Sequence, residues 1–176
     1  GAAESGLAAL EAAVATAVPL VLDADGLRQL SRAPALLPRA AGAVVLTPHP
    51  GEMHALLAGF DLARYIGQTR TAQAEALAAR TGAVVVLKGH GTVLAAADRP
   101  ATLNTSGTAG LATAGTGDVL AGLLGGLLAQ GAEPWAAAQT AVFVHGLAAE
   151  LAGGDRALVA DDLLNLIGPA WRERTP

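Results

Sequence analysis

An acidic residue directly after a glycine-rich turn is the feature of this sequence best suited to chemistry. Asp118 follows Gly115-Thr116-Gly117, and from Val119 onward pairs of large apolar side chains recur every four residues, as in a helix with one apolar face. The free N–H groups and the dipole at the start of such a helix favour an anion, most naturally phosphate. A carboxylate beside a phosphate needs a metal ion or a reacting proton, so the stretch indicates phosphate chemistry. The alternative is an ordinary aspartate near a helix N-terminus.

Polar residues also lie at the ends of three segments, 19–25, 43–47 and 83–87, that read as buried strands. They are Asp23 and Asp25 in the acidic end of the first segment, His49 and Glu52 after the second, and Lys88 to Thr92 after the third. In open α/β sheets ligands bind at the carboxyl ends of strands, so we expect these clusters and the loop 104–118 to converge on one edge. Lys88 is the single lysine among eleven basic residues and lies in a glycine-rich turn, which favours phosphate binding over an incidental surface position.

Other potential sites are less specific. His49 and Glu52 could orient a substrate or a metal-bound water, or could simply belong to a proline-rich turn before a helix. His145 lies in an apolar helical segment and is expected to be packed in the interior. The spacing of His, Asp and Glu matches no zinc site, Ser106 lacks a nucleophile-elbow context, and no Walker loop occurs.

The composition is that of a single globular domain over residues 1–176. With 52% apolar residues and 22 glycines, the chain can bury a core of closely packed helices and strands. The net charge is −4 without runs of like charge, so neither nucleic acid nor a membrane is expected as a partner. The absence of cysteine excludes disulfides and thiolate chemistry, and no apolar run is long enough to span a bilayer. The N-terminus lacks a signal-peptide pattern and starts without Met inside a helix-like pattern, so we expect a fragment or a processed product.

Apolar strands and helical segments alternate along the chain. Helices are predicted at 4–17, 26–37, 53–59, 68–80, from 119, at 134–151 and after 161. A hairpin is predicted to join 92–96 to 101–103. Near-continuous apolar strands alternating with helices indicate an α/β fold with a mainly parallel sheet covered on both faces.

Five motifs together resemble the NAD(P)H-hydrate dehydratase family. They are DADGL at 23–27, TPHPGEM at 47–53, VVLKGHGTV at 85–93, ATAGTGDVLAGLLGGLLAQG at 112–131 and VFVHGLAAELA at 142–152. Their order and spacing match the family over nearly the whole chain, and TPHPGE with LKG and GTGD is far more specific than any one motif. The resemblance implies a three-layer α/β/α ribokinase-like domain with a central, mainly parallel sheet.

The resemblance also implies a function, cofactors and site residues. The enzyme would be a cytoplasmic, homotetrameric lyase that restores NADH or NADPH from its hydrate by using ADP, or ATP, with Mg²⁺ to phosphorylate the hydroxyl before phosphate is eliminated. Asp118 would contact substrate as the general base, His49 would bind substrate, and Glu52 would belong to a water-mediated metal shell. The residues that would hold the nucleotide are Lys88, Gly89, His90, Gly91, Thr92, Gly115, Thr116 and Gly117.

The sequence departs from the family at two places. Family members commonly have G-N-P-G-M where this chain has Gly107-Thr-Ala-Gly-Leu111, so one hydrogen bond from an amide side chain to substrate or nucleotide is not expected. The family's N-terminal portion, with a G-P-G turn that contacts substrate, has no counterpart, nor has the epimerase domain often fused to it. We therefore expect an N-terminally truncated domain. Two alternatives stay open: a ribokinase-like kinase of a vitamin precursor, and a non-catalytic nucleotide-binding remnant.

Overall fold

The computed structural model describes residues 2–153 and 158–174 of the chain. It divides into two compact units, Gly1–Lys88 with Val93–Thr102 and Gly89–Thr92 with Leu103–Pro176. We call the first the sheet unit and the second the helical unit, and each is described by itself. The prediction of a single domain over residues 1–176 is not tested by this division and stays a prediction.

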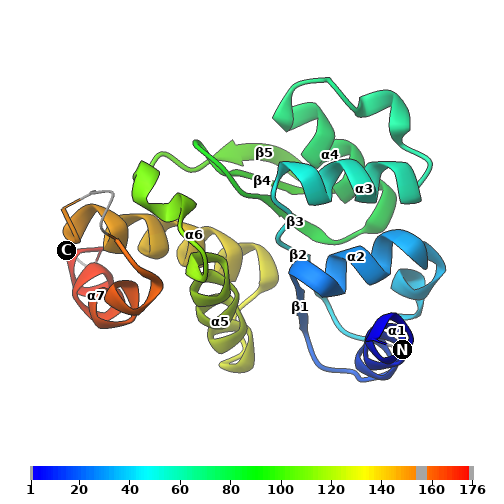
Figure 1. Cartoon of the computed structure of the whole chain (residues 1–176), viewed down its shortest axis with the longest axis horizontal. Helices are drawn as coiled ribbons and strands as arrows, with labels where there is room; N and C mark the ends of the chain where they lie inside the picture. The colour runs from blue at the N-terminus through cyan, green and yellow to red at the C-terminus, as the bar shows by residue number, and fades with distance from the viewer. Residues whose placement is uncertain (1, 154–157, 175–176) are drawn as a thin grey trace. The chain divides into compact units, whose positions relative to one another are not determined.

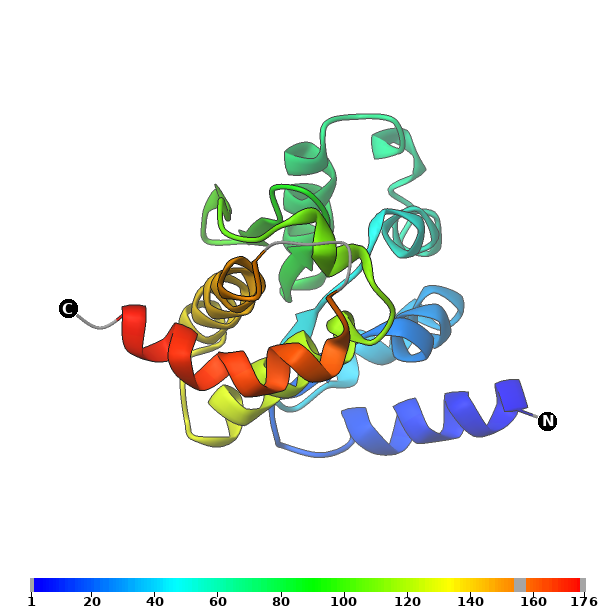
Figure 2. The same ribbon diagram turned by 60° about the vertical axis from the view of Figure 1, so that its left-hand side comes forward.

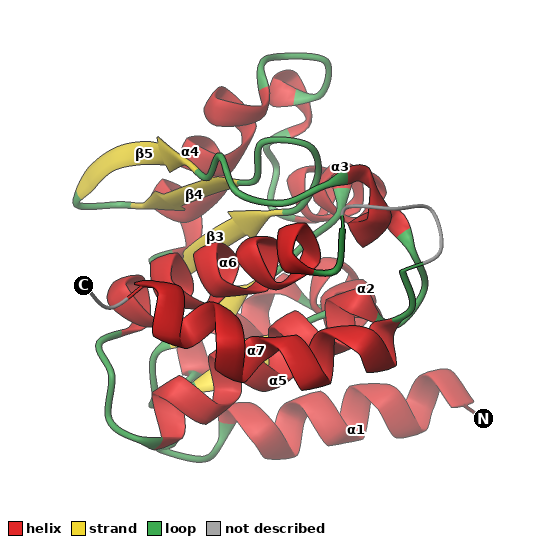
Figure 3. Ribbon diagram, turned by 90° about the vertical axis from the view of Figure 1, so that its left-hand side faces the viewer, coloured by secondary structure: helices red, strands yellow, loops and turns green. Residues whose placement is uncertain are grey.

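The sheet unit is built on five strands that lie in chain order. They are β1 (Leu20–Leu22), β2 (Val44–Leu46), β3 (Val84–Leu87), β4 (Val93–Ala96) and β5 (Arg99–Leu103). The first three are parallel, with Leu22 opposite Leu46 and Leu46 opposite Val85, whereas β4 runs antiparallel to β3. Figure 3 shows β4 and β5 as the predicted hairpin beside β3. The sheet is therefore mixed, because the hairpin extends its parallel part.

Helices connect the parallel strands of this unit on one face of the sheet. The connecting helices are α2 (Ala24–Arg32), between β1 and β2, and α3 (Pro50–Gly59) and α4 (Arg70–Thr81), between β2 and β3, with short 3₁₀ turns at Pro34–Arg39 and Ala63–Tyr65. Helix α1 (Ala2–Val14) precedes β1 and packs against α2. Right-handed crossovers between strands that advance in one direction place the connecting helices on the same side, as Figure 1 shows. The core between these helices and the sheet contains the fully buried side chains of Leu30, Leu46, Met53 and Leu77.

The helical unit consists of three long helices and one short turn. These are η3 (Ala109–Ala112), α5 (Thr116–Ala129), α6 (Pro134–Leu151) and α7 (Ala160–Arg174). The three long helices pack against one another, and Figure 2 shows them from yellow-green to red. Their common core includes Val144, Ala148 and Leu163, which have no exposed surface. In the described part of the chain, no helix is both long and apolar enough to cross a membrane.

Candidate active site

The carboxyl ends of β1, β2 and β3 are joined by backbone hydrogen bonds. The amide and the hydroxyl of Thr47 both donate to the carbonyl of Leu22, at 3.1 and 3.2 Å. The amide of Lys88 donates to the carbonyl of Pro48 at 2.8 Å. Asp23, His49 and Lys88, one residue from each of three predicted polar clusters, therefore follow strand ends that are joined at one edge of the sheet unit. The remainder of the third cluster, Gly89 to Thr92, belongs to the helical unit. The convergence of the three clusters with the loop 104–118, which belongs to the helical unit, stays a prediction.

Lys88 forms an ion pair with Asp23 across this edge. The ammonium lies 2.6 Å from Oδ1 of Asp23, and the two side chains are only 21% and 14% exposed. The same oxygen accepts from the amide of Ala24 and so caps α2. The strand predicted at 19–25 thus ends at Leu22, and Asp25 instead pairs with Arg28 in the first turns of α2. A carboxylate already engages the charge of Lys88, so a phosphate would have to share this ammonium with Asp23.

His49 and Glu52 form a reciprocal cap at the start of α3. Nδ1 of His49 accepts from the amides of Gly51 and Glu52, at 2.9 and 3.3 Å, so in this cap the ring proton sits on Nε2. Oε2 of Glu52 accepts from the His49 amide at 2.8 Å, and its Oε1 lies 3.5 Å from Nε2 of His49. The imidazole is 57% exposed, so its Nε2–H is accessible to a ligand. Both Glu52 oxygens face His49, which leaves direct metal coordination by Glu52 less favourable than a contact through water.

Arg70, at the start of α4, fixes the end of β3 just before the glycine-rich turn. Its Nη2 donates to the carbonyls of Leu87 and Lys88, at 2.8 and 3.1 Å. Burial lowers the pKa of this guanidinium. Sequence reasoning missed Arg70, and no sequence signal marks it, because only the tertiary fold brings it to carbonyls 17 and 18 residues away.

The turn from Gly89 to Thr92 depends on glycine geometry. Gly89 has φ 141° and Gly91 has φ 63°, a region that residues with side chains rarely adopt. The hydroxyl of Thr92 donates to the carbonyl of Gly89 at 3.1 Å, and the Thr92 carbonyl accepts from the amide of Asn104 at 2.8 Å. His90 is exposed at the tip. The tight turn predicted to approach a nucleotide is therefore present.

In the helical unit, Gly115 sets the turn that begins α5. Its φ is 87°, and a Cβ there would lie 3.0 Å from Cβ of Ala160 on α7. The amide of Thr116 is already bonded to Thr113, whereas that of Gly117, at the second helical position, has no intrahelical acceptor. Asp118 follows and is exposed. The predicted anion site therefore has fewer free backbone N–H groups than the three expected at residues 115–117. The exposed carboxylate of Asp118 lies beside it.

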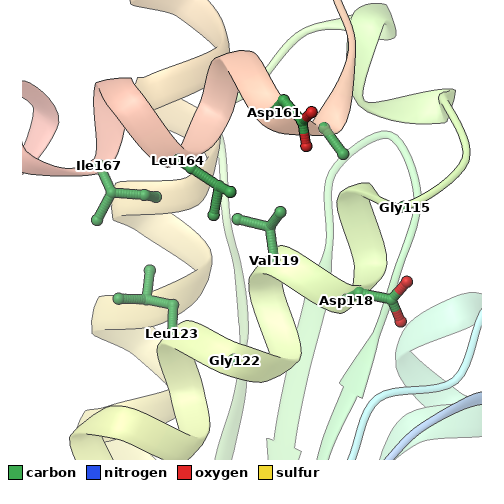
Figure 4. Close-up of a pocket in the computed structure, with 9 residues that line it drawn as sticks. Gly115, Asp118, Val119, Gly122, Leu123, Asp161, Leu164 and Ile167 are labelled. Carbon is green, nitrogen blue, oxygen red and sulfur yellow. The ribbon is translucent and has the colours of Figure 1, made fainter.

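A pocket of about 600 Å³ lies beside this turn, between α5 and α7. Figure 4 shows Val119 and Leu123 of α5 facing Leu164 and Ile167 of α7, whereas Asp118 points away from them. Apolar side chains therefore line most of this pocket, and the carboxylates of Asp118 and Asp161 lie at its edge. Among the described residues, no group of three or more His, Cys, Asp or Glu side chains could hold a metal ion.

Comparisons with known sequences give one consistent result. A family model described as NAD(P)H-hydrate dehydratase matches residues 1–168. An ADP-dependent (S)-NAD(P)H-hydrate dehydratase from Neisseria meningitidis serogroup B is 44% identical over 156 residues, 88% of this chain and 52% of that protein. A bifunctional NAD(P)H-hydrate repair enzyme from Moorella thermoacetica is 42% identical over 153 residues, 85% of this chain and 28% of that protein. The chain spans about half the length of the first relative and less of the second.

Comparisons with solved structures agree. The ADP/ATP-dependent NAD(P)H-hydrate dehydratase from Bacillus subtilis, co-crystallized with ATP/Mg²⁺, superposes with a TM-score of 0.80 at 32% identity, over 97% of this chain and 60% of that one. A ribokinase-like superfamily protein from Enterococcus faecalis gives a TM-score of 0.68 at 28% identity, over 89% of this chain and 54% of that one. These similarities confirm the predicted ribokinase-like α/β fold.

Proposed function

The chain belongs to the NAD(P)H-hydrate dehydratase family, and from that premise we propose that its protein is an ADP-dependent hydro-lyase that returns (S)-NAD(P)H-hydrate to NAD(P)H. One observation carries the proposal beyond the resemblance. An exposed carboxylate, Asp118, directly follows a left-handed glycine at the N-terminus of α5, beside an amide without an intrahelical acceptor. This arrangement joins a phosphate-binding turn to a group able to take up a proton.

The proposed role of Asp118 is that of general base. In the ionised form a carboxylate accepts the proton of a substrate hydroxyl as that oxygen takes up the terminal phosphoryl group of ADP and AMP leaves. The Gly117 amide and the positive end of the α5 dipole would stabilise the charge on the transferred group. His49 would donate a hydrogen bond from Nε2–H to the hydrated nicotinamide, because its Nδ1 is occupied in the cap of α3.

The residues present fit a nucleotide, with backbone as the main ligand. The turns at 89–92 and 115–117 use glycines in conformations that bring the main chain close to a ligand, as phosphate cradles require. Lys88, paired with Asp23, would contribute a positive charge that it shares with that carboxylate. When bound, Mg²⁺ would neutralise the negative charge of the phosphoryl group. Glu52 would take part through water.

The kinase alternative shares this machinery and differs in its product. A kinase would leave a stable phosphorylated compound, whereas the dehydratase would release inorganic phosphate and NADH in equal amounts. Product analysis by phosphorus NMR, with hydrated NADH and ADP, separates the two, and accumulation of a phosphorylated product would exclude the dehydratase. The remnant alternative predicts ADP binding without any product and with affinity independent of Asp118. Cytoplasmic location and a homotetramer stay predictions, to be checked by cell fractionation and light scattering.

A further inference from the structure

We propose that three residues of α6, His145, Gly146 and Glu150, are positioning residues that set the shape of the loop 104–118. They lie in the motif 142–152, to which the proposed mechanism gives no role. The structural claim stands on contacts within the helical unit alone. Its catalytic consequence rests on the proposed function, because Asp118 ends this loop.

His145 holds the end of the loop next to Asp118. Its Nε2 lies 2.9 Å from the carbonyl oxygen of Thr116, the first residue of α5, and its side chain is buried, with 6% of its surface exposed. A carbonyl can only accept, so Nε2 carries the proton. The Thr116 hydroxyl lies 2.7 and 2.8 Å from the carbonyl oxygens of Leu111 and Thr113, which share its one proton. Thr116 is therefore tied both to its own loop and to α6.

Glu150 holds the beginning of the loop. Its Oε1 accepts from the amide of Gly107 at 2.7 Å, a charge-assisted hydrogen bond. Gly107 has φ 109°, which side-chain-bearing residues rarely adopt, so the bond fixes a backbone conformation that is costly for other residues.

Close packing at Gly146 completes this attachment. A Cβ on Gly146 would lie 2.2 Å from Oγ of Ser106 and 2.7 Å from its carbonyl carbon, so only glycine admits the loop at this distance. The Ser106 hydroxyl donates to the carbonyl of Phe143 at 3.0 Å, and Asn104 donates to the Ser106 carbonyl at 3.0 Å. Phe143, Gly146 and Glu150 are spaced three and four residues apart, and this spacing places them on one helical face.

Both ends of the loop are thus attached to one helix whose own position is well fixed. Val144 and Ala148 of α6 are fully buried in the core of the helical unit. A helix anchored in this way can hold Gly107 and Thr116 at a constant separation. The direction in which Gly117 and Asp118 present their groups then depends on α6 as well as on the turn itself.

The first test needs no enzymatic activity and uses the full chain labelled with ¹⁵N. Glu150→Ala should raise the amide exchange rate of Gly107 about tenfold or more, as expected for loss of a charge-assisted hydrogen bond. Glu150→Gln keeps an acceptor oxygen and should stay within about threefold of the parent. Gln139→Ala, on an exposed position of the same helix, is the matched control and should change nothing. An unchanged Gly107 rate in Glu150→Ala would overturn the assignment of Glu150.

The second test concerns His145. Long-range ¹H–¹⁵N spectra of the parent chain should place the proton of the neutral ring on Nε2, and a proton on Nδ1 would overturn its assigned contact with Thr116. His145→Gln can keep an N–H donor near the same place, whereas His145→Leu removes it. Amide shifts at 115–118 should therefore move in the Leu variant and largely return in the Gln variant.

A kinetic measurement distinguishes a loss of loop positioning from a general loss of protein stability. In a form of the protein that restores NADH, Glu150→Ala and His145→Leu should lower kcat about tenfold to a hundredfold, measured well below each melting temperature. The KM for ADP should change less, and the Gln variants should recover most of the loss. Unchanged kcat in both variants would overturn the positioning role. If no form of the protein restores NADH, the proposed function fails, while the exchange and tautomer measurements still decide this inference.

Discussion

At the scale of single residues, the account depends most on Asp118. We predict that Asp118→Asn abolishes turnover, with a loss of at least about a hundredfold, because an amide cannot accept the hydroxyl proton. The side chain is exposed and makes no fold-determining contact that the structure describes, so the melting temperature should stay nearly constant. ADP binding, followed by calorimetry, should be retained. Retained turnover would remove Asp118 as the base.

The Asp23–Lys88 pair gives a second prediction at this scale. Lys88→Met should weaken ADP binding and also destabilise the chain, because it leaves the Asp23 carboxylate without its partner at a site only 14% exposed. The loss should fall between about 1 kcal/mol for exposed pairs and roughly 3–5 kcal/mol for buried ones. Urea unfolding of Lys88→Met, Asp23→Asn and the double variant measures the coupling directly. Additive effects of the two changes would show that the pair contributes nothing, and unchanged ADP affinity in Lys88→Met would place the nucleotide elsewhere.

Several residues of the candidate site could be predicted from local sequence, but the residues with which they form hydrogen bonds could not. The single lysine, the GTGD turn and the proline-flanked His49 could be recognised from local sequence. The link from Lys88 to Asp23 spans 65 residues, and that from His145 to Thr116 spans 29, so both depend on tertiary packing. His145 was expected to be packed in the interior and is buried, yet its hydrogen bond to Thr116 had no local signal.

At the scale of elements, the cap of α3 has two separable tasks. His49→Asn should keep the helix cap, because Asn is a preferred N-cap residue, but should lose the Nε2–H that we assign to substrate. His49→Ala should lose both, with a destabilisation of about 1 kcal/mol. Thermal unfolding and the KM for the hydrate separate the two effects. Equal KM values for His49→Asn and the parent would contradict a substrate contact through His49.

Two glycines of α5, Gly115 at its N-cap and Gly122 in its interior, should respond oppositely to substitution by alanine. Gly115→Ala should destabilise the chain by about 1–3 kcal/mol, because its φ is 87° and a Cβ would press against Ala160. Gly122→Ala on the same helix should instead stabilise it by roughly 1 kcal/mol, since no atom of the helical unit lies within 4 Å of the added carbon. Denaturant unfolding of both variants is the measurement. The same sign of change at both positions would refute this distinction.

The element pattern was predictable because periodicity and turn residues are local. The strands and helices occur close to their expected places, and α6 begins at Pro134 as predicted, with Glu133 as its N-cap residue. Element ends were less predictable. The first strand stops at Leu22 because Asp23 caps the next helix, and α3 begins at Pro50 because His49 supplies the cap. Gly122, Gly125 and Gly126 weaken the helix intrinsically, so their sequence predicts the close approach of a neighbouring backbone. That prediction is wrong within the helical unit, because no heavy atom lies within 4 Å of a Cβ built at any of the three.

At the scale of the whole molecule, the candidate site residues are distributed over both compact units. The sheet unit holds His49 and the Asp23–Lys88 pair, and the helical unit holds the turn at 89–92 and Asp118. Sequence spacing predicted the family because the five motifs span nearly the entire chain, and the family match over 1–168 confirms it. The chain spans about half the length of its Neisseria relative, and the test of activity therefore includes both this chain and a longer form.

The most direct test follows the dihydronicotinamide absorbance as hydrated NADH is incubated with ADP and Mg²⁺. We would compare this chain, a version extended upstream to the length of the curated relatives, and the extended version carrying Asp118→Asn. The account predicts recovery of absorbance by the extended protein, release of one phosphate per NADH formed, and no recovery with Asp118→Asn. Absence of recovery by an extended protein that binds ADP would contradict the proposed dehydratase activity.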